Sequence, residues 1–536
     1  MTPARHIFNL RFIIAASLLF STPAFLAAAT YTWDGGGDTN FLTPENWNPD
    51  GAPVSADDTL IVFTGATNTA PVLNSAFTVK DLSFNTATSF TLSGAGTLSV
   101  YGAGTGSVSG NNQGITNTGA GAQAVANDIL LTGNAQFYAI GGKLTLSGAI
   151  NGNGKSLALR SFSNTSRLVI ENSISGVSAL NFNSSTTGVV ELRASNSYTT
   201  TSNIWRGTAL AAHDSAFGTG EVRLGLNNAT AAYLEGTAAV LTDGARTIAN
   251  NIRLVSVSAG ERTGPNIIGG STAHVSTFSG NILVNSFSAN NDQKAEALTL
   301  TATAGGRVHF TGNIQRAAGV SADSHTDHLT KTGLGIVALN GSNNTYSGTT
   351  TVSEGTLLIN GVLASGGDTV TVSSGATLGG SGTVNRAITV LDGATFSAGN
   401  IDDDSGASLA GTFTAGAGLA LANTATLHFD LGATSDSVSV TGDFTLGGTL
   451  NITALEGFGA GTYTLFSYAG GAFVNNGLAL GVTPAGFDYE LNFATAGQVS
   501  LIVTSAIPEP GFIALLVAGA ALISTVVSRR LRRNAR

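Results

Sequence analysis

The sequence predicts an all-β protein, an elongated right-handed parallel β-helix (β-solenoid) with a cap at each end and one C-terminal transmembrane helix. The chain has 536 residues, 70 glycines and only 10% charged residues, which favours many short strands joined by glycine turns over a single globular core. Its C-terminal half contains a segment that recurs at a spacing close to one β-helix coil. Because the chain has no cysteine, backbone ladders between coils must stabilise it without disulfides.

Residues 1–29 have the composition of a secretory signal peptide. Arg5 and Arg11 precede an apolar run at 12–20, and the segment ends in three alanines. A basic region, an apolar region and an A-x-A site in this order predict export and cleavage at the end of the segment. The alternative is a retained membrane anchor, although the apolar run is shorter than the roughly 20 residues that a span requires.

Residues 30–65 are predicted to form an N-terminal cap. The segment holds Trp33 and Trp47, two of the three tryptophans of the chain. The first coil of a solenoid needs a cover over its open end, and aromatic side chains bury large areas, so a cap is the expected role of both rings. The alternative is a platform on which sugars stack.

Residues 66–328 are predicted to form a degenerate part of the solenoid. An apolar or aromatic residue followed by Ser or Thr, Gly, Asn or Ala, and Ile occurs at 146–150, 278–282 and 310–314. The last two copies lie 32 residues apart. These recurrences indicate that the same local structure returns in different coils.

The segment 329–360 is the clearest single coil. Alternating apolar and polar residues are interrupted by glycines, as in short strands joined by tight turns. The motif positions are Leu329, Lys331, Gly333, Gly335, Leu339, Asn344, Tyr346, Gly348, Gly355, Thr356 and Leu357. On these positions the segment resembles the autotransporter-associated β-strand repeat of bacterial surface proteins, which implies one coil of a stacked β structure. Asn196, Tyr198 and the pair 207–208 repeat the spacing, so a second coil of the same type is expected there.

Residues 361–441 are predicted to continue the solenoid. The segment 370–378 recurs with an offset of 18 residues at every position. Because side chains at the same position of successive coils stack about 4.8 Å apart, Val372 is expected to lie over Val390. By the same offset, Thr377 is expected to lie over Thr395.

Residues 442–505 are predicted to form a C-terminal cap of β strands. The segment has fewer repeats and more aromatic residues than the solenoid. A terminal cap hides the edge of the last coil, since uncovered edges would allow rods to join end to end.

The final segment, 507–536, combines three parts in order. The motif Pro508, Glu509 and Pro510 precedes an uncharged apolar stretch at 511–528, the predicted transmembrane helix. The basic cluster that follows consists of Arg529, Arg530, Arg532 and Arg533, which are expected to stay cytoplasmic. The tail resembles the PEP-CTERM sorting signal of Gram-negative bacteria. This resemblance implies that an exosortase-type membrane enzyme recognises the Pro-Glu-Pro motif and can remove the tail during sorting. The alternative is a plain tail anchor without processing.

The sequence offers few candidates for catalysis or metal binding. Asp402, Asp403 and Asp404 form a run of three carboxylates, but their glycine- and serine-rich surroundings are typical of a solvated turn, and successive strand residues point to opposite faces. The one concentrated group of metal-type ligands, a weak candidate for a divalent-ion site, contains His325, Asp327 and His328. A charged loop is the favoured prediction there, so we expect no metal, no cofactor and no catalytic residue.

Charge limits the class of partner. Seven of the 23 basic residues lie in the two terminal segments, whereas nearly all of the 32 acidic residues lie between them. The body is therefore strongly acidic and repels phosphate backbones, so nucleic acid is not expected as a partner.

These observations predict a non-enzymatic rod that is secreted or anchored at the cell surface. Many weak polar sites along a rod suit adhesion or association with exopolysaccharide or matrix through multivalency. The tail resemblance adds that such signals are associated with bacteria that make exopolysaccharide. The predicted location is the cell surface, outer membrane or extracellular matrix, with the C-terminal helix in the membrane before any processing. The alternatives are a β-helical polysaccharide lyase or glycoside hydrolase, which needs paired acid and base groups, and an inert surface spacer.

Overall fold

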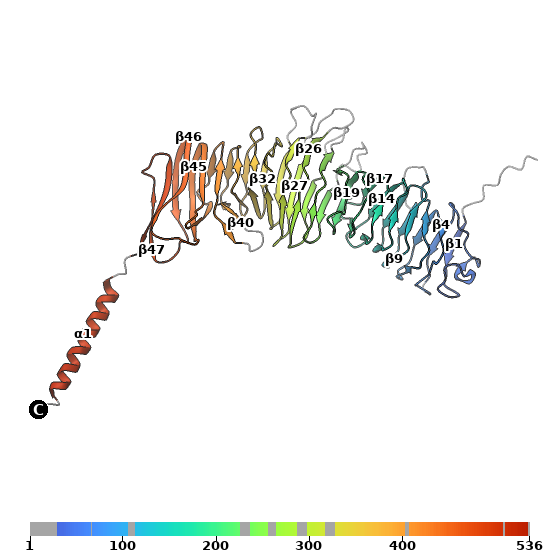
Figure 1. The fold of residues 1–536 in the computed structure, drawn as a ribbon, viewed down its shortest axis with the longest axis horizontal. Helices are drawn as coiled ribbons and strands as arrows, with labels where there is room; N and C mark the ends of the chain where they lie inside the picture. The colour runs from blue at the N-terminus through green and yellow to red at the C-terminus, as the bar shows by residue number, and fades with distance from the viewer. Residues whose placement is uncertain are drawn as a thin grey trace, which may run out of the picture.

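The computed structural model describes residues 29–65, 67–104, 113–225, 236–255, 264–286, 297–316, 327–401, 407–506 and 510–533. In these residues the chain forms an elongated rod of β-strands, and the helix α1 (Pro510–Arg533) stands away from its C-terminal end (Figure 1). Strands of successive coils pair in parallel and build long stacks. The prediction of a mostly β chain with parallel, solenoid-type pairing is confirmed, and the right-handed coil stays a prediction.

The first stack starts at the N-terminal end. Its members are β1 (Thr30–Trp33), β3 (Leu60–Phe63), β5 (Asp81–Phe84), β8 (Gly114–Asn117), β11 (Ala135–Ala139), β14 (Ser156–Ser161), β17 (Ala179–Asn183), the first part of β19 (Ser202–Ala211), β20 (Val222–Leu224), β23 (Ile252–Val255), β26 (Ile282–Ser286) and β29 (Ile314–Arg316).

The second stack runs beside it and continues to the C-terminal end. Its members are β6 (Thr91–Leu92), β9 (Gln123–Val125), β12 (Leu144–Leu146), β15 (Leu168–Ile170), β18 (Val189–Leu192), the second part of β19, β21 (Ala238–Thr242), β24 (Asn266–Gly270), β27 (Ala297–Ala302), β30 (His328–Thr332), β32 (Thr350–Val352), β35 (Val370–Val372), β38 (Ile388–Val390), β43 (Leu419–Leu421) and β45 (Ser437–Ala454).

Two further stacks close the coils. The third stack, in the N-terminal half, consists of β4 (Phe77–Val79), β7 (Leu98–Val100), β10 (Ile129–Leu131), β13 (Ile150–Asn151) and β16 (Ile174–Ser175). The fourth stack, in the C-terminal half, consists of β22 (Thr247–Ile248), β25 (Val275–Phe278), β28 (Arg307–Phe310), β31 (Ile336–Leu339), β33 (Thr356–Ile359), β36 (Thr377–Gly380), β39 (Thr395–Ala398) and β44 (Thr426–Leu431), and it also ends on β45. A shorter set contains β34 (Val362–Leu363), β37 (Thr383–Val384) and β42 (Thr412–Ala415), and β40 (Asn400–Ile401) forms an antiparallel hairpin with β41 (Ser408–Leu409).

The register between coils follows the periods in the sequence. Val372 pairs with Val390, and Thr377 pairs with Thr395, as the 18-residue offset predicts. The 32-residue offset is confirmed in the same way, because Phe278 pairs with Phe310. A fixed offset thus identifies residues that occupy the same place in neighbouring coils.

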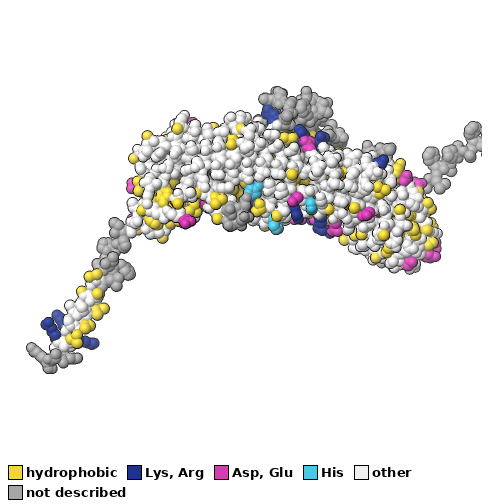
Figure 2. All heavy atoms as spheres, viewed as in Figure 1, with side chains coloured by type: hydrophobic (Ala, Val, Ile, Leu, Met, Phe, Trp, Pro, Cys, Tyr) yellow, Lys and Arg dark blue, Asp and Glu magenta, His cyan; other side chains and the backbone are white. Residues whose placement is uncertain are grey.

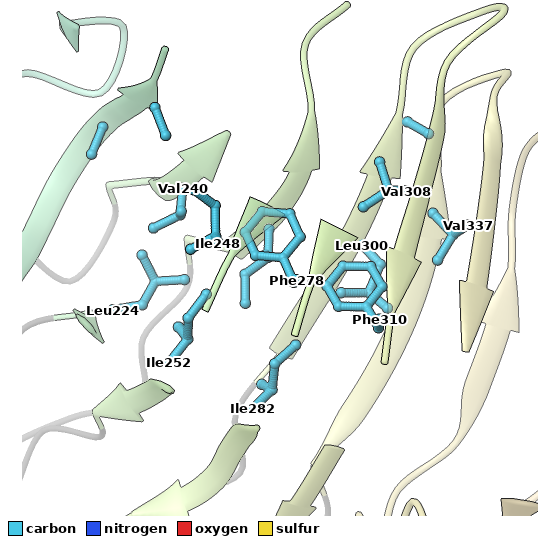
Figure 3. Close-up of a cluster of buried hydrophobic side chains, with 14 of the residues drawn as sticks. Leu224, Val240, Ile248, Ile252, Phe278, Ile282, Leu300, Val308, Phe310 and Val337 are labelled. Atoms are coloured by element: carbon cyan, nitrogen blue, oxygen red, sulfur yellow. The ribbon is translucent and has the colours of Figure 1, made fainter. Parts of the chain in front are cut away.

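The core is a continuous column of apolar side chains inside the coils. Phe278 and Phe310 stack with ring centroids 5.3 Å apart and an interplanar angle of 9°. Figure 3 shows the two rings side by side among Ile248, Ile282 and Val308, side chains that come from strands of several coils. Each coil therefore buries its apolar face against the next one, which replaces the disulfides that the chain lacks.

The predicted N-terminal cap, residues 30–65, contains β1, β3 and β2 (Trp47–Asn48), which follows the short 3-10 helix η1 (Pro44–Asn46). Trp33 and Trp47 have no exposed surface, and their rings meet edge to face with centroids 5.1 Å apart. The Trp47 Nε1–H donates to the carbonyl of Phe41 at 2.7 Å. Because both rings are buried, neither is available as a platform for sugars, and the cap stays a prediction.

The C-terminal end is built by β45, β46 (Gly461–Leu480), β47 (Phe487–Asn492) and β48 (Gln498–Ser505). β46 pairs in parallel with β45, and β48 lies antiparallel to both β46 and β47. The cover is incomplete, because β48 pairs only with residues 461–467 of β46. Beyond them, the outer edge at 469–480 pairs with no strand in the described ranges, so the predicted cap hides the last edge only in part.

The helix α1 covers the predicted transmembrane segment 511–528, and its side chains are described from Val517 onward. Within the described part of the chain, no helix combines the length and the apolarity that crossing a membrane demands. The predicted transmembrane helix is therefore not confirmed. The described side chains of α1 are exposed, among them Leu522 and Ile523.

Candidate adhesive surface

The motif asparagine of the central coil replaces a peptide group in a backbone ladder. Asn344 Oδ1 accepts the N–H of Ile314 from the preceding coil at 2.9 Å, and Asn344 Nδ2 donates to the carbonyl of Val362 in the next coil at 3.0 Å. Asn196 does the same, since Oδ1 accepts from Ile174 N–H and Nδ2 donates to the carbonyl of Ala216. A side-chain amide has the same donor and acceptor groups as a peptide bond. Asn344 and Asn196 therefore link the coil before them to the coil after them at positions outside the strands.

The motif tyrosine points into the core. Tyr346 is 2% exposed, and its hydroxyl lies 2.6 Å from Thr350 Oγ1. Tyr198 repeats this contact with Ser202 at 2.8 Å, which confirms the predicted second coil of this type. The guanidinium of Arg386 lies 4.5 Å from the centroid of the Tyr346 ring and donates to the carbonyls of Tyr346, Gly348 and Ala364. Burial raises the pKa of Tyr346, so the phenol stays neutral.

The motif lysine closes a glycine turn. Lys331 has no exposed surface, and its Nζ donates to the carbonyls of Thr332, Gly333 and Glu354 at 3.0, 2.6 and 2.9 Å. Burial lowers the pKa of Lys331 to about 8 against the opposing effect of the Glu354 carboxylate. Gly333 has φ +74°, a conformation that side chains disfavour, and a Cβ at Gly335 would clash with the carbonyl of Thr303. The buried motif side chains Lys331, Asn344 and Tyr346 therefore build the coil and offer nothing to a ligand.

The candidate metal ligands are only partly described. His325 lies outside the described residues, Asp327 is 1% exposed, and the exposed His328 has Nδ1 2.8 Å from Thr349 Oγ1. Over the described ranges, no group of three or more His, Cys, Asp or Glu side chains is placed to hold a metal ion. Asp402, Asp403 and Asp404 also lie outside these ranges.

The sorting-motif residues lie mostly beyond what the structure describes. Pro508 and Glu509 are outside the described residues, and Pro510 is the first residue of α1. The basic cluster of Arg529, Arg530, Arg532 and Arg533 is exposed in the last turns of this helix (Figure 2). Positive charges at the C-terminal end of a helix interact favourably with the helix dipole.

Two carboxylates on the N-terminal half are held in ion pairs. Glu191 accepts from Arg193 at 2.5 Å and from Arg167 at 2.8 Å, and Glu221 lies 2.9 Å from Arg253. Burial acts to raise the pKa of Glu191, but its hydrogen bonds to both arginines outweigh burial and lower the pKa. An ionised carboxylate bound by two guanidinium groups is a poor general acid, because it holds no proton to donate.

The pKa of Asp436 is raised and not lowered, and this shift makes the stability of the protein depend on pH. Its side chain is fully buried and accepts the N–H groups of Gly411 and Asp430, each at 2.8 Å. Burial raises the pKa of Asp436 to about 7 despite these hydrogen bonds. Because the folded state then binds this proton more tightly than the unfolded state, the contribution of Asp436 to stability is complete below about pH 4 and declines as the pH rises to about 7.

The comparison of wild type with Asp436→Ala at two pH values tests this effect. We expect the stability advantage of wild type to shrink by about 2–3 kcal/mol between pH 5 and pH 8, since one pKa unit corresponds to about 1.4 kcal/mol. Urea unfolding of both proteins measures it. An equal advantage at both pH values would show that Asp436 is ionised throughout.

The solvent-facing side of the second stack carries rows of hydroxyl groups. Consecutive strands place Thr299 beside Thr330, then Thr351, Thr371 and Thr389. A second row begins with the paired Thr301 and Thr332 and continues with Ser353 and Ser373, which follow β32 and β35 directly. We call these residues the threonine face: Thr299, Thr301, Thr330, Thr332, Thr351, Ser353, Thr371, Ser373 and Thr389.

The threonine face is accessible and uncharged. All nine side chains are partly exposed. Thr301 Oγ1 lies 3.4 Å from the carbonyl of Thr332, and the other eight hydroxyls make no hydrogen bond to a residue in the described ranges. The sequence predicts polar sites along the rod but not this face, because the rows appear only once the register of five coils is known.

The passenger-associated-transport-repeat family matches residues 329–359, which confirms the autotransporter-associated repeat predicted at 329–360. The match does not bear on the PEP-CTERM signal, which stays a prediction.

The chain is similar to the adhesin BmaC autotransporter of Brucella suis biovar 1 (strain 1330), with 38% identity over 84 residues. The match covers 14% of this chain and only 2% of that protein. The chain therefore contains a passenger-associated transport repeat and is distantly similar to an autotransporter adhesin.

Proposed function

We propose that the protein is a non-enzymatic, adhesin-like rod of the cell surface or extracellular matrix. The observation that carries this proposal is the long solenoid whose motif side chains face inward while repeated uncharged polar groups face outward. The transport repeat and the distant similarity to an adhesin support it. Many weak contacts along one rod give strong attachment through multivalency.

Deletion of the gene tests adhesion directly. We expect mutant cells to attach less to surfaces or to retain less of the protein's matrix partner, and complementation with the full chain to restore attachment. Unchanged attachment and matrix composition would favour an inert spacer instead. The enzyme alternative is tested by incubating the purified chain with polysaccharides, where the release of new reducing or unsaturated ends would support a lyase or hydrolase.

We further propose that 507–536 directs sorting by an exosortase-type enzyme and attaches the chain to a membrane before any processing. The exposed apolar residues of α1 and the exposed arginines at its end support this role, since exposed apolar surface of this kind marks contact with a membrane or a partner. Intact mass and terminal sequencing of the protein from cells and medium test it. A chain that ends near Pro510 supports processing, and a retained tail contradicts it.

A further inference from the structure

We propose that the threonine face binds an extended, uncharged polysaccharide that lies along the rod axis. This inference deepens the proposed adhesive function and rests on it. It assigns the contact surface to one side of the second stack, over β27, β30, β32, β35 and β38, and it assigns the chemical class of the ligand.

The regular spacing of the rows along the rod axis favours a ligand whose own groups repeat along its length. Threonines of one row belong to consecutive paired strands, so they recur every ~4.8 Å along the axis, the spacing of paired strands. The surface is the solvent-facing side of a sheet, so a ligand that contacts all five coils must be extended. A linear chain of sugar residues offers hydroxyl groups at a repeat of comparable length.

The hydrogen-bonding chemistry also matches. Each Thr or Ser hydroxyl supplies one donor and two acceptor sites, as each sugar hydroxyl does. Eight of the nine hydroxyls of the threonine face have no hydrogen-bond partner among the described residues, so a ligand does not need to break contacts within the protein. Each hydrogen bond alone contributes little, but contacts with successive coils add along one polymer.

Charge selects an uncharged polymer. None of the nine residues is charged, and the one lysine of β30, Lys331, is buried with its Nζ on backbone carbonyls. The whole chain has a formal net charge of −9. An acidic polysaccharide would be repelled by the rod and would find no cation on this face.

A purely structural explanation of the rows is the preference of β-branched residues for strands. Valine shares this preference and the shape of threonine but lacks the hydroxyl. Threonine-to-valine substitution therefore separates the two explanations, since the structural one predicts no change in binding.

The test uses the full chain and particles of cellulose and chitin, two insoluble uncharged polysaccharides, with alginate beads as the acidic comparison. The variant carries Thr330→Val, Thr351→Val and Thr371→Val. The matched control carries Thr356→Val, Thr377→Val and Thr395→Val on the fourth stack, where these threonines form a single row. The second row is missing there, because Leu358 and Gly379, two positions further along β33 and β36, are buried. Circular dichroism and thermal unfolding establish that both variants keep the fold.

We expect wild type to bind at least one uncharged polymer and not alginate. The variant should need at least a tenfold higher concentration for half-saturation, and the control should stay within twofold of wild type. Wild type that binds neither uncharged polymer, equal binding to alginate, or equal losses in both triple variants would each overturn the inference. If attachment of the cells depends on the gene but the protein binds no polysaccharide, this inference is wrong and the adhesive function still holds. If deletion of the gene leaves attachment unchanged, the adhesive function itself is wrong.

Discussion

Replacing Trp47 by alanine is expected to open the N-terminal coils while the rest of the rod stays folded. The ring is fully buried and lies 5.1 Å from Trp33 and 4.9 Å from Phe41 between centroids. Removing a buried Trp ring costs about 3–5 kcal/mol, because the cavity collapses only in part. Strand pairing joins each coil only to its neighbours, so the loss should stay local.

Hydrogen exchange measured by mass spectrometry follows this opening segment by segment. The amides of β1, β3 and β5 should exchange faster in Trp47→Ala, and those of β35 and β38 should not change. The matched control is Val54→Ala, because Val54 lies in the same segment but is 60% exposed. Unchanged exchange in β1 and β3 would contradict the role of Trp47 in the cap.

Replacing Tyr346 by alanine is expected to destabilise the central coil by about 3–5 kcal/mol, the range for truncation of a large buried aromatic side chain. The substitution removes the ring on which Arg386 stacks and the hydroxyl that contacts Thr350. Arg386 then keeps its hydrogen bonds to backbone carbonyls but lies beside a cavity.

Tyr346→Phe is the matched variant, since it keeps the ring and loses only the hydroxyl. We expect a cost of about 1 kcal/mol, the usual net contribution of one hydrogen bond. Hydrogen exchange over β30 to β38 distinguishes the two variants. Equal effects of Ala and Phe would show that the hydroxyl contact, and not the ring, stabilises the coil.

Periodicity explains how much of this fold is predictable from sequence. Val372 and Val390 are paired because an offset that holds at every position fixes the register between two coils. Arg386 shows the limit. It bonds to Gly348, which lies 38 residues earlier, and no repeat connects these two positions. Long side chains that cross coils follow from the three-dimensional packing, which a period does not encode.

The ends and the surface were harder to predict than the coils. The burial of Trp33 and Trp47 follows from the need to cover the first coil, but the uncovered edge of β46 does not follow from the aromatic composition of 442–505. The threonine face was predictable only as separate stacked positions, because its accessibility depends on what the rest of the chain leaves uncovered.

The way the coils are joined also determines how the rod responds to a pulling force. β1 lies at one end of the rod and α1 at the other (Figure 1). The hydrogen bonds between coils point along the rod, so tension along the rod axis pulls directly on the boundaries between coils. The step from Leu329 to its partner Thr350 spans 21 residues, and one such coil extends by about 70 Å when it peels off. Under such tension, a terminal coil that peels off would lengthen the chain and absorb mechanical work while the other coils stay folded.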